Sequence, residues 1–221
     1  MGNDVMALRR RFMAARPSGG LLPAAYQQVE WIASDGTAFI KSGYTPSINI
    51  SRVTWRYELT GTYTGDEMMF GYTRSAITDT RISVELYDRS RWYNNIGQSA
   101  FSNVLKNCGT NLNTIYDGDM TLETLTIDGN SVNITGTRSN IGGDREVYIF
   151  AWNHTNGTAQ YINQYVRLYR ITIYESGAPA ADFVPCYRKS DNEIGMYDIV
   201  SQTFHGNAAA SGTLSKGNDI A

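Results

Sequence analysis

From Leu21 onward, several stretches of the chain alternate apolar and polar residues with a period of two. One such stretch is residues 52–59, in which the even positions carry arginine, threonine and glutamate. Its apolar odd positions are Val53, Trp55, Tyr57 and Leu59. Because successive side chains of a strand point to opposite faces, this stretch predicts a strand with one buried face. Residues 81–86 repeat the pattern and predict another such strand.

Further strands are predicted along the rest of the chain. Residues 122–127 and 131–135 flank Asp128-Gly129-Asn130, a turn sequence that predicts a hairpin. Residues 146–152 are apolar on both faces, which is typical of a central strand covered on both sides, and residues 165–174 form the longest strand candidate. Strands at this spacing, separated by turn residues and with no second helix, predict an antiparallel two-sheet sandwich or jelly roll. We expect one domain over residues 21–217 and a short tail over 218–221.

Before this region, residues 4–15 predict the one helix of the chain. Asp4 suits the helix N-cap, and alanine, leucine, methionine and arginine favour the helical conformation. The apolar stripe of this helix consists of Val5, Leu8 and Phe12. Because so short a helix is marginally stable alone, two interpretations stay open: a frayed tail, or an anchor that docks on a partner subunit. Residues 16–20 then read as a linker.

The composition indicates an ordinary globular protein. Hydrophobic residues make up 42% and charged residues 18% of the chain, and the net charge of -2 gives no electrostatic footprint for nucleic acid. No apolar stretch is long enough to span a bilayer, and no apolar run follows the arginines at 9–11, so no secretion signal is expected. We therefore expect synthesis as a soluble cytoplasmic product. Cys108 and Cys186 favour two buried free thiols over one long-range disulfide, which stays open.

The C-terminal third carries a recognisable combination of segments. Residues 148–153 and 167–174 precede the run Pro-Cys-Tyr-Arg-Lys-Ser-Asp at 185–191, which is followed by Gly-Met-Tyr-Asp at 195–198. With the opening segment 22–32, this closely resembles concanavalin A-like, laminin G-like jelly-roll domains, which are frequent in phages and prophages of gut bacteria. The resemblance implies a jelly-roll fold over nearly the whole folded part. It also implies a calcium ion as an option, because laminin G-like relatives often hold one, although the sequence identifies no ligands for it.

The same C-terminal run can be interpreted from its residues alone. Residues 182–184 read as a strand end, because Pro185 removes a ladder donor and must lie at an edge or leave the sheet. Residues 189–192 supply a turn, and Gly195 permits a close approach before the chain packs back on the body. Cys186 is interpreted as a packed thiol, since no feature indicates a lowered pKa.

Candidates for catalysis are few. The resemblance implies that a hydrolase of this fold would place clustered carboxylates along one strand, where alternate positions point two acids at one sugar bond. The nearest candidates are Asp117, Asp119 and Glu123. However, Gly118 and the composition of residues 116–119 favour a solvated turn that enters a strand at Leu122. His154 and His205 have no partners at a spacing typical of a triad or a metal site, and His205 reads as a surface or packing residue. We expect the protein not to be an enzyme.

Binding of sugars is better supported, because it needs exposed flat aromatic rings with amides or carboxylates nearby. Residues 91–95 and 152–156 have this composition. The candidate ligand-binding residues are Trp92, Tyr93, Asn94, Trp152, Asn153 and His154. The alternative for each segment, which the residues favour, is an aromatic ring that packs across its sheet beside turn-forming asparagines. That alternative weakens if both segments face one surface.

The leading interpretation is a phage or prophage virion structural protein, such as a head decoration, fibre or tail component. In it the segment 1–20 docks on other virion proteins, and the lectin-like domain binds glycans or the host surface, or only stabilises the capsid. A homo-oligomer is expected, because virion proteins are commonly symmetric assemblies. One alternative is a bacterial carbohydrate-binding module that acts alone. The other is a glycoside hydrolase of the same fold, in which Asp117, Asp119 and Glu123 line a cleft.

Overall fold

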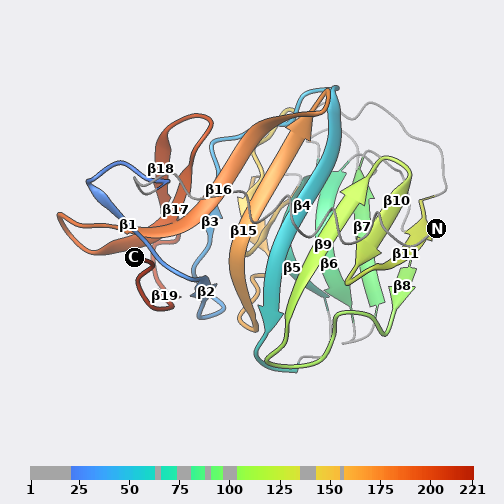
Figure 1. The fold of residues 1–221 in the computed structure, drawn as a ribbon, viewed down its shortest axis with the longest axis horizontal. Helices are drawn as coiled ribbons and strands as arrows, with labels where there is room; N and C mark the ends of the chain where they lie inside the picture. Colours follow the sequence, from blue (N-terminus) through green and yellow to red (C-terminus); the bar gives the residue numbers. More distant parts are fainter. Residues whose placement is uncertain are drawn as a thin grey trace.

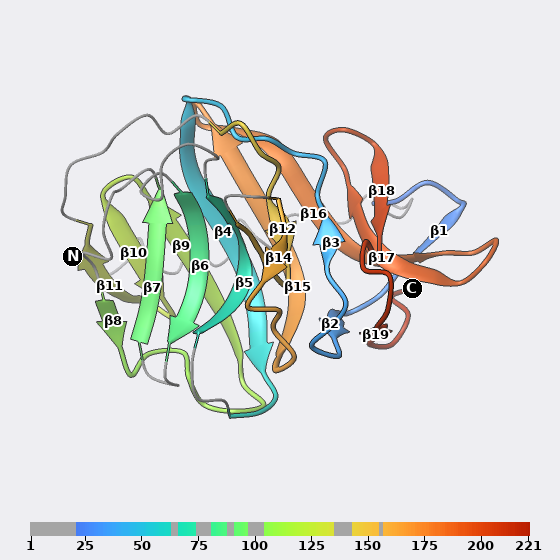
Figure 2. The same cartoon turned by 180° about the vertical axis from the view of Figure 1, so that it is seen from behind.

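The computed structural model describes residues 21–62, 66–73, 81–87, 91–96, 104–134, 143–154 and 157–221. Over these residues the regular elements are all strands, and none is a helix. The strands form two sheets that lie as layers, the first in front of the second in Figure 1 and behind it in Figure 2. The all-β, mainly antiparallel, two-sheet architecture predicted from the sequence is confirmed.

The first sheet contains the longest strands of the chain. Its eleven described strands are β1 (Tyr26–Gln28), β2 (Ile32–Ser34), β4 (Ile50–Leu59), β9 (Ile115–Thr121), β10 (Thr124–Ile127), β11 (Asn130–Asn133), β15 (Val166–Glu175), β16 (Ala178–Arg188), β17 (Glu193–Asp198), β18 (Thr203–Gly206) and β19 (Leu214–Lys216). The main order is β11-β10-β9-β4-β15-β16-β17-β18. In addition, β1 pairs with β16, and β2 pairs with both β15 and β19. The strand predicted at residues 165–174 is therefore confirmed as β15, in the middle of the sheet.

The second sheet contains shorter strands from the middle of the chain. Its eight described strands are β3 (Ile40–Lys41), β5 (Asp66–Thr73), β6 (Arg81–Tyr87), β7 (Arg91–Ile96), β8 (Val104–Lys106), β12 (Tyr148–Ile149), β13 (Trp152–Asn153) and β14 (Ala159–Gln160). The order is β14-β13-β5-β6-β7-β8, and β12 pairs with both β5 and β3. The strand predicted at residues 81–86 is confirmed as β6, with Ile82, Val84 and Leu86 buried. The expectation of a single buried face was wrong, because Ser83 and Glu85 between them are buried as well.

Aromatic side chains from both sheets meet in the core. Trp55 and Tyr57 of β4 point inward and are 2% and 0% exposed. The Trp55 ring meets the ring of Phe70 in β5 edge-on at 5.9 Å, and the Tyr57 ring meets that of Trp92 in β7 at 5.1 Å. Edge-to-face pairs of this kind contribute stability beyond the area that they bury. The alternation in residues 52–59 thus correctly predicted which face of this strand is buried.

Gly118 lies inside β9, directly opposite Trp55 of β4. A Cβ atom at Gly118 would lie 2.1 Å from Cε2 of the Trp55 indole, so the glycine leaves room for that ring. The prediction of a turn over residues 116–119 was wrong, because β9 already begins at Ile115. The physical role of this glycine is cross-strand packing.

The hairpin predicted around Asp128-Gly129-Asn130 is confirmed. Strands β10 and β11 pair antiparallel, with Ile127 opposite Asn130. The two residues between them, Asp128 and Gly129, have φ angles of 49° and 79°. Two consecutive positive φ angles match the twist of the flanking strands, as in type I′ turns.

The prediction of one central strand over residues 146–152 was wrong. Strands β12 and β13 are separate, and Phe150 between them has a φ of 66°. β12 runs antiparallel to β5 and β13 runs parallel to it, and both pair at Gly71. The apolar composition of the segment still reports burial correctly, since residues 147–151 are at most 3% exposed.

Pro185 lies in the middle of β16, so the predicted strand end before it was wrong. On one side Pro185 pairs with Met196 of β17. On the other side the pairing with β15 ends at Phe183, and the pairing with β1 starts at Cys186. The Pro185 carbonyl accepts a hydrogen bond from the Val29 N–H. The N–H and C=O of a strand residue point to the same side of the strand. The N–H donor that proline lacks therefore falls where the partner of β16 on this side changes from β15 to β1.

The rest of the C-terminal run behaves as predicted. Residues 189–192 form the turn between β16 and β17. Gly195 pairs with Gly206 of β18, and a Cβ atom at Gly195 would lie 2.2 Å from the carbonyl oxygen of His205. The close approach predicted at Gly195 is confirmed.

The two cysteines are free thiols, as the preferred interpretation expected. Cys186 is buried in β16, and burial raises the pKa of its thiol to about 12. Little thiolate is therefore present at neutral pH, which confirms Cys186 as a packed thiol. Cys108 is only half-buried, and its carbonyl oxygen accepts a hydrogen bond from Trp92 Nε1 at 2.8 Å.

The predicted helix at residues 4–15, with its stripe of Val5, Leu8 and Phe12, lies outside the described residues, as does the linker. Among the residues that are described, no helix is long and apolar enough to cross a membrane.

Candidate functional site

Trp92, the first predicted sugar-stacking residue, lies in the core. Its side chain is 0% exposed and packs against Tyr57, and its Nε1 donates a hydrogen bond to the Cys108 carbonyl. The alternative that the sequence favoured, a ring packed across its sheet, is confirmed for Trp92, which occupies the inward face of β7, and its candidacy as an exposed binding ring was wrong. The side chains of Tyr93 and Asn94 lie outside the part of the chain that the structure describes.

The second predicted segment lies at the surface only in part. Trp152 and His154 are half-buried, and their rings meet edge-on at 4.9 Å. Asn153, between them, is buried: its side chain is 3% exposed, and its Nδ2 donates a hydrogen bond to the Glu146 carbonyl at 2.9 Å. Its predicted role in contacting a ligand was therefore wrong. The ring of Trp152 also stacks on Tyr161 at 5.7 Å. With the other predicted tryptophan in the core, the two segments do not form one surface.

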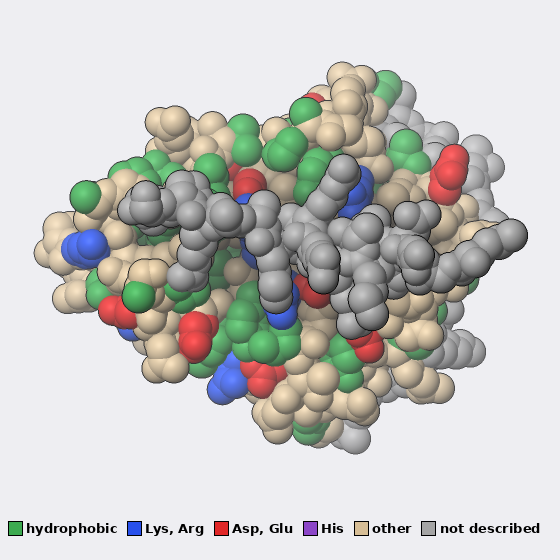
Figure 3. All heavy atoms as spheres, viewed as in Figure 1, with side chains coloured by type: hydrophobic (Ala, Val, Ile, Leu, Met, Phe, Trp, Pro, Cys, Tyr) green, Lys and Arg blue, Asp and Glu red, His purple; other side chains and the backbone are tan. Residues whose placement is uncertain are grey.

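Two of the three carboxylates considered for hydrolysis pair with arginines on an open sheet face. Asp119 accepts hydrogen bonds from Nε and Nη2 of Arg52 at 2.8 and 2.5 Å. Asp117 lies 3.8 Å from Nη1 of Arg56 with its side chain 74% exposed, and Glu123 is exposed in the turn after β9. In the view of Figure 3, acidic and basic side chains are interspersed on this side of the molecule. This arrangement lacks two acids that face each other across a bond.

No three histidine, cysteine or acidic side chains gather to hold a metal ion within the described ranges. The calcium ion that the resemblance implies stays a prediction. His205 is a packing residue, as predicted, and its ring meets that of Phe183 edge-on at 6.0 Å. Its Nε2 atom is buried without a hydrogen-bond partner.

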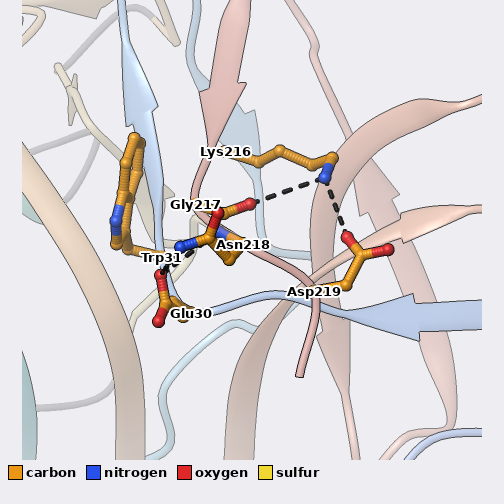
Figure 4. A pocket seen from close by; sticks show the side chains of 6 residues that line it. All are labelled: Glu30, Trp31, Lys216, Gly217, Asn218 and Asp219. Carbon is orange, nitrogen blue, oxygen red and sulfur yellow. Dashed lines mark hydrogen bonds and ion pairs between the residues drawn. The ribbon is translucent and has the colours of Figure 1, made fainter. Parts of the chain in front are cut away.

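A shallow hollow of about 620 Å³ opens beside β2 and β19 (Figure 4). It is lined by Glu30, Trp31, Lys216, Gly217, Asn218 and Asp219. Two backbone hydrogen bonds join its walls: the Glu30 N–H donates to the Asn218 carbonyl, and the Gly217 N–H donates to the Trp31 carbonyl. Asn218 and Asp219, from the segment 218–221 that was predicted as a tail, thus form part of a wall.

The indole of Trp31 is held in place from behind by charged side chains. The guanidinium of Arg167, in β15, lies 4.3 Å from the centre of the Trp31 ring. Nη1 of Arg167 donates to both carboxylate oxygens of Glu58 at 3.2 and 3.3 Å, and the Tyr169 hydroxyl donates to the same carboxylate at 2.7 Å. Burial and this bond raise the pKa of Tyr169, so its hydroxyl stays a donor at neutral pH. The cation on the ring and its bonded partners fix the orientation of the indole.

The edge of the Trp31 indole is left uncovered by Gly217. A Cβ atom at Gly217 would lie 2.7 Å from Nε1 of Trp31 and 3.0 Å from Cβ of Glu30. The φ angle of Gly217 is not positive, so space at the indole, and not backbone conformation, explains the glycine. The Trp31 Nε1–H makes no hydrogen bond to the described part of the chain, and it is therefore available to a ligand.

Polar groups flank this edge. The Glu30 Oε2 atom accepts hydrogen bonds from the N–H and the side-chain Nδ2 of Asn218 at 3.2 and 3.1 Å, which leaves Oε1 as an acceptor. At the far rim, Nζ of Lys216 donates to Asp219 at 2.9 Å, and the Tyr187 hydroxyl donates to the other oxygen of Asp219 at 3.2 Å. The bond from Lys216 lowers the pKa of Asp219, so this rim carries a compensated pair of charges.

The hollow thus combines an oriented aromatic ring with an indole donor, a carboxylate acceptor and an amide. Such a combination suits a sugar, whose C–H face packs on a ring while its hydroxyls need donors and acceptors. The lining has no histidine or cysteine. Sequence reasoning missed this site because its walls are far apart in the chain: Glu30 and Asn218 are separated by 188 positions in sequence.

The chain matches no family model, and no curated protein matches it. The resemblance to concanavalin A-like and laminin G-like jelly rolls therefore stays a prediction.

Proposed function

We propose that this protein binds a glycan in the hollow beside Trp31 and has no catalytic role. The observation that carries the proposal is an indole stacked on Arg167 with its N–H edge uncovered by Gly217. A sugar ring packs its C–H face on the accessible surface of Trp31, and its hydroxyls bond to the Trp31 N–H, the free oxygen of Glu30 and the Asn218 amide. A shallow site of this kind binds one or two sugar units at the end of a longer glycan.

The proposal extends to the place of the protein in a virion. The run at residues 182–198 and the opening at 22–32 support a jelly-roll domain of the kind found in phages and prophages of gut bacteria. The two packed sheets are compatible with that finer fold. In this role the segment 1–20 attaches the domain to other virion proteins, and the hollow faces the host surface in a homo-oligomer.

A glycan array with the full chain tests the binding function. Wild type is expected to bind a subset of the printed neutral, N-acetylated and sialylated oligosaccharides, and Trp31→Ala is expected to lose that binding. Tyr174→Ala is the matched control, because Arg52 lies 5.4 Å from the Tyr174 ring in a similar stack away from the hollow. Equal binding by wild type and Trp31→Ala, or no binding by wild type, would refute the proposal.

A carbohydrate-binding module that acts alone would use the same hollow, and the lining residues support it equally. The two functions differ in the role of residues 1–20. Virion proteins should be captured by the full chain and not by a chain that lacks residues 1–20. Equal capture by both chains would remove the anchoring role, and glycan binding without any capture would favour the module.

A further inference from the structure

A second aromatic surface lies on the other sheet, where Tyr161 stacks on Trp152. The two ring centres are 5.7 Å apart with 25° between the planes, and the His154 ring closes one edge of Trp152 at a right angle. Tyr161 is 44% exposed, whereas Trp152 is half-buried. Tyr161 is therefore the outer ring of the stack, and Trp152 supports it from inside.

The backbone of Tyr161 has a left-handed conformation, which glycine and asparagine adopt more readily than tyrosine. Its φ angle is 51°, in the left-handed region that is rare for bulky residues and tolerated by asparagine. Two backbone hydrogen bonds hold the chain near this residue: the Tyr161 carbonyl accepts from the Met68 N–H at 3.2 Å, and the Asn163 N–H donates to the Phe150 carbonyl at 2.8 Å. Residues held in this way cluster at ligand sites. Stability alone does not explain an exposed tyrosine at this position.

A polar group accompanies the stack. Gln160 pairs directly with Trp152 across β13 and β14, so the two side chains share one face of the sheet. The Gln160 amide makes no side-chain hydrogen bond to the residues that the structure describes. It can therefore serve a ligand that lies on the neighbouring Tyr161 ring.

We propose that Tyr161, supported by Trp152, is a second carbohydrate-contact surface, on which one sugar ring lies against the outer face of the tyrosine. The size of the surface favours this ligand. A stable protein interface buries about 800 Å² on each partner, whereas a single exposed ring with one amide matches one pyranose. The surface is separate from the hollow, which belongs to β2 and β19 of the first sheet. Two separate contacts on one glycan or on neighbouring glycans raise avidity without a deep pocket.

The test compares Tyr161→Asn with Tyr161→Phe in the full chain, on the glycan array described above. Asparagine tolerates the left-handed φ, so the first variant is expected to fold, with an unfolding midpoint close to that of wild type. It should bind at least one wild-type glycan about tenfold more weakly, or about 1.4 kcal/mol. Phenylalanine keeps the ring and should keep the affinity. Wild-type affinity of Tyr161→Asn for every glycan would overturn the proposal.

Trp31→Ala on the same array separates this inference from the proposed function. Loss of binding in Trp31→Ala with full binding in Tyr161→Asn would overturn only the second surface. Loss in Tyr161→Asn with full binding in Trp31→Ala would overturn the hollow and leave the second surface standing. A wild type that binds no printed glycan would overturn both. Hydroxyl-radical footprinting gives a local readout, because a bound glycan should reduce the oxidation of Tyr161.

Discussion

Replacement of Gly118 by alanine tests the packing of the two sheets. The added Cβ would lie 2.1 Å from Cε2 and 2.3 Å from Cζ2 of Trp55, whereas ordinary contacts begin near 3.4 Å. The indole or the strand must therefore move by more than an ångström in a core that is otherwise filled. Overpacking of this kind lowers the free energy of unfolding by about 2 kcal/mol. For a chain of this size, that corresponds to a thermal unfolding midpoint lower by about 6 °C.

Equilibrium urea unfolding followed by circular dichroism measures this cost, and the Trp55→Phe background supplies the control. Phenylalanine lacks the outer ring of the indole, so Gly118→Ala should cost at least about 1 kcal/mol less there than beside Trp55. Equal costs of Gly118→Ala in both backgrounds would show that the indole does not occupy this space.

Three further changes have expected outcomes. Trp92→Ala should lower the unfolding free energy by about 4 kcal/mol without a selective loss of glycan binding, as measured by urea unfolding and the array. Burial lowers the pKa of His205 below its ordinary value of 6.5. As the pH falls, this imidazole is therefore protonated in the unfolded chain at a higher pH than in the folded chain. Stability should therefore fall as the pH drops below 6.5, and His205→Gln should flatten that slope; an unchanged slope contradicts the assignment. Native Cys186 should resist iodoacetamide at pH 8 and react after unfolding, by mass spectrometry.

Local periodicity predicted those features that depend on neighbours in sequence. The buried face of residues 52–59 follows from their alternation, because a strand repeats every two residues. The hairpin at Asp128-Gly129-Asn130 follows from turn chemistry for the same reason. Burial of residues 147–151 also followed from composition. Their division into two short strands did not, because it depends on the positive φ of Phe150 and on pairing with β5.

Features that depend on distant partners were not predictable. From the sequence alone, Gly118 resembles a turn glycine, because its cross-strand partner Trp55 is not evident. Pro185 resembles a strand end in the same way, because the sequence does not show that β16 stops pairing with β15 two residues earlier. The tryptophans show the same limit. Trp92 has the composition of a sugar site yet faces the core, whereas Trp31 gains its polar neighbours from a segment near residue 218. Pairing across the sheets decides which ring stays accessible.

Titration of the indole N–H signals tests the central claim most directly. The chain has four tryptophans, at positions 31, 55, 92 and 152, so a ¹⁵N spectrum shows four indole signals, which single Trp→Phe variants assign. With the best-bound glycan of the array, the Trp31 signal should shift to saturation while the signals of Trp55 and Trp92 stay in place. A Trp31 signal that does not move at saturating glycan would contradict binding in the hollow.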